Sequence, residues 1–186
     1  MKTDDYRRDG KSPLRGDLEG PIINKVEESG LLQFDLEELY QSGERILFDL
    51  KPWLFQELIL KEKDFRERIK NHDWPQYENK FVAITCTADA IVPTWAYMLV
   101  VTQLEPIAKT IVFGSPALLE EQLFREAISK LDPQKFKNQK VVIKGCGDHV
   151  PVSAYVEFTN FLRPLVKSIM YGEPCSTVPV YKSKGS

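Results

Sequence analysis

Three cysteines and one histidine are the residues of this chain whose types could hold a metal ion. Cys86, Cys146 and Cys175 each follow an apolar or helical stretch, and His149 comes three positions after Cys146. Thiolates select zinc, iron or iron–sulfur clusters, and imidazole suits zinc and iron. The four residues therefore predict a metal site with three sulfurs and one nitrogen, which would hold zinc or iron.

Three other interpretations of these residues stay open. Buried cysteines can act as small hydrophobic residues, and the chain lacks a Cys-x-x-Cys pair, which would be a stronger metal signal. Cys146 could instead be the nucleophile of a thiol-dependent enzyme, because Gly145 and Gly147 allow close approach to the backbone and His149 could act as base. The third interpretation is a binding module without chemistry, whose loops dock a partner protein.

Strands must position the first two cysteines. Apolar runs predict three strands over residues 81–85, 110–113 and 140–144, and weaker signals predict strands over 46–48 and 178–181. Strands separated by helices of about a dozen residues are typical of βαβ units and a mainly parallel sheet. Because the carboxyl ends of parallel strands meet at one edge, we expect Cys86 and Cys146 to lie close together there.

Helices are predicted between and around these strands. An apolar stripe at helical period and favourable i,i+4 charge pairs predict a helix from residue 53 to about 71. Later helices are predicted over 93–104, 115–130 and 151–171, the last with a kink at Pro164. Residues 95–101 are apolar nearly all round the helix, so we expect this helix to be covered on more than one side.

Length and composition are those of a single globular domain. The chain has 186 residues, of which 42% are hydrophobic and 28% charged. A chain of this length buries roughly 70% of the surface that its unfolded form exposes. We predict a disordered arm over residues 1–20, one α/β domain over 21–182 with an N-terminal helical extension, and a flexible tail over 183–186.

Charge and hydropathy restrict the partners and the location that we expect. The net charge of −2 gives no reason to expect a nucleic acid or an anionic membrane as partner. The first 20 residues lack the apolar segment of a secretory signal, and no run reaches the ~18 apolar residues of a membrane span. The odd number of cysteines then favours a cytoplasmic protein with reduced thiols.

Four stretches of the chain are similar to a known family. The segment from Ile22 to Lys182 resembles an uncharacterised family found mostly in Bacteroidetes, domain of unknown function 2480. The stretches that carry the resemblance are residues 54–66, 89–97, 144–146 and 168–179. The resemblance implies an accessory role in sulfur mobilisation and iron–sulfur cluster assembly, with assembly proteins as partners. It assigns no catalytic residue.

Overall fold

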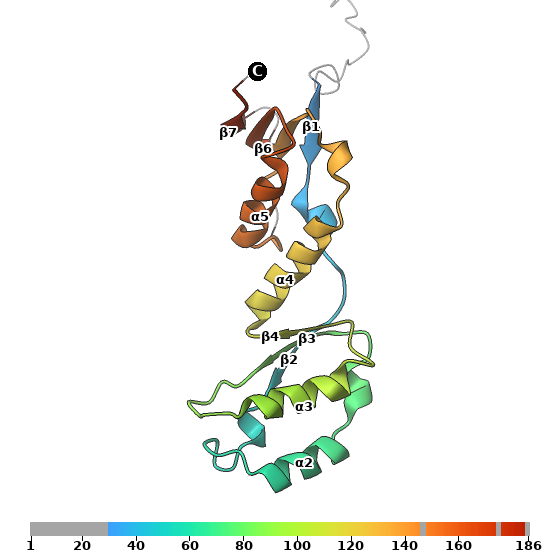
Figure 1. Cartoon of the computed structure of the whole chain (residues 1–186), viewed down its shortest axis with the longest axis vertical. Coiled ribbons are helices and arrows are strands. Elements are labelled where there is room, and N and C mark those ends of the chain that lie inside the picture. Colours follow the sequence, from blue (N-terminus) through green and yellow to red (C-terminus); the bar gives the residue numbers. More distant parts are fainter. Residues whose placement is uncertain (1–29, 146–147, 174–175, 185–186) are drawn as a thin grey trace, which may run out of the picture.

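Two separate sheets lie at the two ends of an elongated molecule (Figure 1). The computed structural model describes residues 30–145, 148–173 and 176–184. Sheet A has the strand order β1-β5-β6-β7, and sheet B has the order β2-β3-β4. The fold is α/β with mostly parallel strands, as predicted, but the expectation of one sheet that holds all the predicted strands is wrong.

Sheet B is built from three parallel strands that lie between residues 45 and 113. They are β2 (Arg45–Asp49), β3 (Phe81–Thr85) and β4 (Thr110–Phe113). Helix α3 (Thr94–Leu104) crosses from β3 to β4, and α2 (Glu62–Asn71) packs into the same core. We call sheet B with α2 and α3 lobe B. The buried side chains of its core are Phe48, Leu50, Phe65, Ile69, Tyr77, Val82, Ile84, Ala96, Val100 and Leu104.

An aromatic cluster closes the side of lobe B beside β2. Two short 3₁₀ helices, η2 (Lys51–Trp53) and η3 (Trp74–Tyr77), bring their tryptophan side chains against Phe48. The His72 ring lies in this cluster, and its Nε2 is 2.9 Å from the Tyr77 hydroxyl. Burial lowers the pKa of His72, although the charge of Asp73 acts in the opposite direction.

Sheet A combines the first described strand with the C-terminal strands. The parallel strands are β1 (Leu31–Phe34), β5 (Lys140–Ile143) and β6 (Ser168–Glu173), and β7 (Ser176–Lys182) runs antiparallel beside β6. Helix α5 (Val152–Leu162) covers one face. We call sheet A with α5 lobe A. Two 3₁₀ helices, η1 (Leu36–Leu39) and η4 (Pro133–Lys135), complete the described elements of this lobe.

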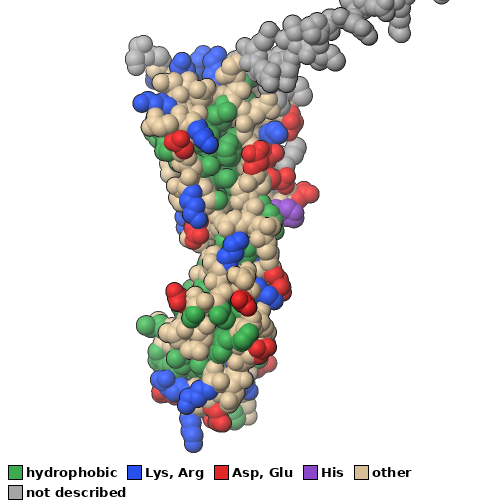
Figure 2. Space-filling model, turned by 90° about the vertical axis from the view of Figure 1, so that its right-hand side faces the viewer, with side chains coloured by type: hydrophobic (Ala, Val, Ile, Leu, Met, Phe, Trp, Pro, Cys, Tyr) green, Lys and Arg blue, Asp and Glu red, His purple; other side chains and the backbone are tan. Residues whose placement is uncertain are grey.

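Helix α4 (Pro116–Ser129) belongs to both lobes. It starts after a turn at Gly114, whose φ of +139° favours glycine, and Ser115 Oγ accepts a hydrogen bond from the Leu118 N–H at 3.3 Å. Leu119 and Leu123 pack on the second face of sheet B, against Phe81 and Ala83. Phe124 and Ile128 lie in the core of lobe A. One helix thus joins two otherwise separate cores, and the surface narrows between them (Figure 2).

Two predicted helices are wrong in part. The helix predicted over 151–171 ends at Leu162, and residues 168–173 form strand β6 instead. Pro164 ends the helix because it has no N–H to donate, and Ile169 then faces the core while Met170 lies on the other face. The helix predicted from residue 53 begins only at Glu62, because the preceding loop has positive φ angles at Gln56 and Glu57.

Other predicted elements are confirmed. Strands form over the predicted runs at 46–48 and 178–181. Helices α3 and α4 begin within a residue of the starts that Pro93, Ser115 and Pro116 predict. The N-terminal helical extension is not shown, because the described chain begins at Gly30 and its first element is strand β1. The predicted arm over 1–20 lies outside the described residues.

Candidate functional site

The predicted cysteine site depends on two strands that lie in different sheets. Cys86 follows β3 at the carboxyl edge of sheet B, whereas β5, which leads to Cys146, belongs to sheet A. The expectation that one sheet edge gathers both strand ends is therefore wrong. Cys146 and Cys175 themselves lie outside the described residues, so the metal site of Cys86, Cys146, His149 and Cys175 stays a prediction.

His149 lies in lobe A beside aromatic and acidic neighbours. Its ring stacks on Tyr40, with 5.1 Å between the ring centroids and 28° between the planes. The backbone N–H of Asp148 donates to Glu37 Oε1 at 3.1 Å, which holds this loop against η1. Within residues 30–145, 148–173 and 176–184, no group of three or more His, Cys, Asp or Glu side chains could hold a metal ion.

The carboxyl edge of sheet B is organised by Asp49 at the end of β2. Its carboxylate accepts hydrogen bonds from the Lys51 N–H at 2.9 Å, the Thr87 N–H at 3.0 Å and the Thr87 hydroxyl at 2.5 Å. Burial alone would raise the pKa of Asp49, but these hydrogen bonds outweigh it and lower the pKa. The carboxylate therefore stays ionised and ties the loop after β2 to the loop after β3.

Tyr97 and Cys86 share this edge with Asp49. Burial raises the pKa of the Tyr97 hydroxyl, and electrostatic interactions with Cys86 and Asp49 raise it further, so the phenol is neutral near pH 7. The half-buried Cys86 Sγ lies 4.0 Å from the Ala88 carbonyl oxygen. Asp49 and Tyr97 were not predicted as site residues, although a polar residue at the carboxyl end of a parallel strand is the signal that could have identified Asp49.

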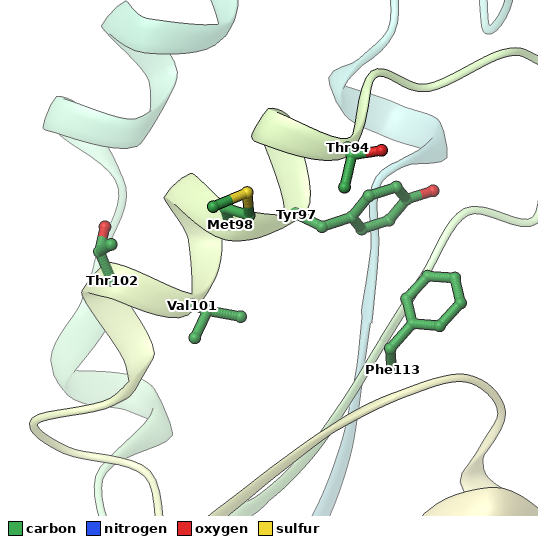
Figure 3. Close-up of a pocket in the computed structure, with 6 residues that line it drawn as sticks. All are labelled: Thr94, Tyr97, Met98, Val101, Thr102 and Phe113. Carbon is green, nitrogen blue, oxygen red and sulfur yellow. The ribbon is translucent and has the colours of Figure 1, made fainter.

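An open apolar groove lies between α3 and the end of β4. Its volume is about 660 Å³, and Figure 3 shows Tyr97, Met98 and Val101 of α3 on one side and Phe113 of β4 on the other. The rings of Tyr97 and Phe113 meet edge to face, with 5.1 Å between their centroids. The hydroxyl-bearing Thr94 and Thr102 complete the lining.

The outer face of α3 is exposed although the helix carries no charge. Its inner residues Ala96, Val100 and Leu104 are buried in lobe B, whereas Met98 is 64% exposed. Phe113, across the groove, is 68% exposed. The described residues therefore do not meet the expectation that this helix is covered on more than one side, because β4 is the last of the described strands of sheet B beside it.

Strand β4 leaves one backbone edge without a partner. Of the described strands it pairs only with β3, so the N–H and C=O groups on its other side face outward. Proteins usually protect such edges with charges or proline, and β7 carries Pro179. The sequence of β4, Thr-Ile-Val-Phe, has neither. The unprotected edge lies directly beside the apolar groove.

Comparison with known proteins places the chain in a family. The family described as "Protein of unknown function (DUF2480)" matches residues 20–183. The chain belongs to this family. No curated protein matches the chain, and no solved structure matches it.

The carboxyl edge of sheet B and the adjacent groove differ in chemical character. The Asp49 carboxylate already accepts three hydrogen bonds from loop groups, so it is occupied rather than poised as a base for the thiol. Met98, Val101 and Phe113 are exposed apolar side chains of the groove, and they lie beside open backbone groups. In the part of the chain that the structure describes, no helix has the length and apolar character needed to cross a membrane.

Proposed function

We propose that the chain is a protein-binding module whose α3–β4 face docks a second copy of the same chain. The α3–β4 face consists of Thr94, Tyr97, Met98 and Val101 on α3, together with strand β4. The observation that carries the proposal is an uncharged helix face, exposed beside the outer edge of β4, which among the described strands pairs only with β3. Helices that are apolar all round, and parallel strands, are normally covered.

The spacing of helices over a sheet supports a second copy as the occupant. Helix α3 connects β3 to β4 and lies over this pair of strands. If β4 pairs with β4 of a second copy, the two α3 helices are separated by about two strand spacings, or ~9.6 Å. Packed helices lie 8–10 Å apart. One dimer would therefore satisfy the backbone edge of β4 and cover the outer face of α3.

The register of this pairing follows from the faces of the strand. Ile111 and Phe113 lie on the α3 face, because they align with Val82 and Ile84 of the lobe B core. A two-fold axis perpendicular to the sheet makes the two β4 strands antiparallel, and opposed residues then share a face. With Val112 opposite Val112, Ile111 of each copy meets Phe113 of the other and forms a continuous apolar row.

The absence of charge from α3 also suits self-association. A charged face would repel its own copy across a two-fold axis, whereas an apolar face does not. Burying a side chain the size of Met98 or Phe113 contributes about 1.5–3 kcal/mol. Two copies of each side chain would lie at the centre of the contact, where hydrophobic anchors contribute most to affinity.

Sedimentation equilibrium over a range of protein concentrations tests the proposal. We expect the full chain to form a dimer of twice its 21.4 kDa mass, and Met98→Glu to be monomeric. Val156→Glu on α5 is the matched control, because Val156 is 66% exposed, similar to Met98. This control should remain dimeric. A monomeric wild-type chain at tens of micromolar, or equal dissociation by both variants, would contradict the proposal.

A cross-link tests the register independently. In Val112→Cys the two introduced thiols face each other across the two-fold axis, so mild oxidation should produce a covalent dimer. Thr110→Cys places its thiols on either side of the axis and should cross-link more slowly, since disulfides need Cβ atoms about 3.5–4.5 Å apart. Faster cross-linking of Thr110→Cys would contradict the pairing at Val112.

The earlier hypotheses about the cysteines stay predictions beside this proposal. Zinc or iron binding by Cys86, Cys146, His149 and Cys175, and a role with iron–sulfur assembly proteins, need the residues that the structure does not describe. The same is true of a thiol-dependent enzyme with Cys146 as nucleophile. A cytoplasmic location likewise stays a prediction.

A further inference from the structure

A basic cavity opens at the end of lobe A opposite the carboxyl ends of β5 and β6. Its volume is about 690 Å³, within the range of small-ligand sites. Five of the described residues that line it are basic, namely Lys140, Arg163, Lys167, Lys182 and Lys184. None of the lining residues is Asp or Glu. Figure 2 shows Lys and Arg side chains at this end of the molecule.

The strand register builds the centre of this cavity. Lys140 of β5 pairs with Ser168 of β6, and Ser168 pairs with Lys182 of β7. Residues in register across neighbouring strands point to the same face. Two lysines therefore flank one serine hydroxyl, and the backbone bond from the Ser183 N–H to the Lys167 carbonyl, at 2.8 Å, holds the end of β7 beside them.

Among the described residues, the basic side chains of the cavity form no ion pair, whereas some other Lys and Arg side chains do. Six other Lys and Arg side chains each form an ion pair with Asp or Glu: Arg45, Lys51, Arg66, Lys80, Arg125 and Lys144. No ion pair between described residues involves the five cations of the cavity. Arg163 instead lies over the Tyr181 ring, 5.0 Å from its centroid. Like charges gathered in this way repel one another, and a bound anion would relieve that repulsion.

We propose that this cavity binds a small anion with several phosphate groups. Lysine ammonium groups and a serine hydroxyl are donors that phosphate oxygens accept, and Arg163 can offer two parallel hydrogen bonds. A small ligand fits better than a nucleic acid, because the cations converge on one cavity of a chain whose net charge is −2. This site is independent of the proposed dimer, since it lies in the other lobe.

Isothermal titration calorimetry of the full chain with inorganic tripolyphosphate tests the site. We expect one ion to bind per chain, with an affinity that falls as salt rises. The double variant Lys140→Gln/Lys182→Gln should lose at least about tenfold in affinity, because two charge-assisted contacts are removed. Lys140→Arg/Lys182→Arg keeps both charges and should still bind. The matched control, Lys63→Gln/Lys70→Gln on α2, removes the same charge from lobe B and should bind like the wild type.

Three outcomes would overturn this proposal. They are no binding at millimolar tripolyphosphate, equal loss of affinity in the control variant, and tighter binding of a single-stranded RNA oligonucleotide than of tripolyphosphate. The last result would identify a nucleic-acid surface instead. If ATP binds more tightly than tripolyphosphate, the cavity also recognises the nucleoside. If the two bind equally, the phosphates alone are recognised. Both of these results support the proposal.

Discussion

Leu119 on α4 offers a direct test of how the two lobes are joined. Its side chain is fully buried in a small cluster with Phe81, Ala83 and Leu123, where α4 covers the second face of sheet B. Truncation of a buried leucine to alanine costs 2–5 kcal/mol, so we expect Leu119→Ala to destabilise lobe B by about 3 kcal/mol. With an unfolding slope of about 2 kcal/mol/M in urea, the midpoint should fall by about 1.5 M.

The tryptophans make this effect measurable lobe by lobe. All three, Trp53, Trp74 and Trp95, pack on the core of lobe B, so their fluorescence reports on that lobe alone. Far-ultraviolet circular dichroism reports on both lobes, because α5 and half of α4 belong to lobe A. In the wild type, the urea unfolding transitions measured by fluorescence and by circular dichroism should coincide. In Leu119→Ala the fluorescence transition should move to lower urea than the circular dichroism transition, because Phe124 and Ile128 still hold α4 on lobe A.

Leu118→Ala is the control for this experiment. Leu118 lies on the same helix but is 47% exposed, so its truncation should change stability by no more than about 0.5 kcal/mol. The reasoning would be refuted if Leu119→Ala moved the fluorescence midpoint by less than about 0.3 M. It would also be refuted if both transitions moved together, since the two lobes would then be coupled by contacts other than this cluster.

Two further predictions concern protonation and metal. Burial lowers the pKa of His72 below its usual 6.5, so the unfolded chain binds the proton more readily than the folded chain does. The free energy of unfolding should therefore fall as the pH drops through about 6.5. In His72→Gln, the plot of urea midpoint against pH should be flatter in this range. An unchanged profile in His72→Gln would contradict this. The predicted metal site implies that freshly purified wild-type protein contains zinc or iron and that Cys175→Ser does not. Elemental analysis measures the metal content of both proteins. A wild-type protein without metal would contradict the hypothesis.

Local signals in the sequence predict most of the individual elements. The strand runs at 81–85 and 110–113 and the start of α4 at Pro116 agree with the structure to within a residue or two. These signals are local because they depend on side-chain branching, on the fixed φ of proline and on the cap at Ser115. Strand β6 was missed because Ile169, Met170 and Tyr171 continue an apolar pattern from α5, which by itself fits a helix or a strand.

The candidate site was only partly accessible to sequence reasoning. The predicted strand over 81–85 placed Cys86 at a carboxyl edge, but its neighbours Asp49 and Tyr97 come from positions 37 residues before it and 11 after it. The exposed face of α3 could not be recognised either. Its apolar sequence predicted burial, and only the structure shows that β4 is the last strand of sheet B among the described residues, which leave this helix face exposed.

The sequence by itself determined the α/β class, the boundaries of most strands and the uncharged character of α3. Tertiary structure alone decided that β5 pairs with β1 and β6 rather than extending sheet B. The physical reason is that backbone hydrogen bonds in a sheet do not depend on side-chain identity, so a strand can pair with any other strand that buries its apolar face. Val141 and Ile143 are buried under α5, where Phe158 and Leu162 cover them. This packing separates the ends of β3 and β5, which the sequence predicted to lie at one sheet edge.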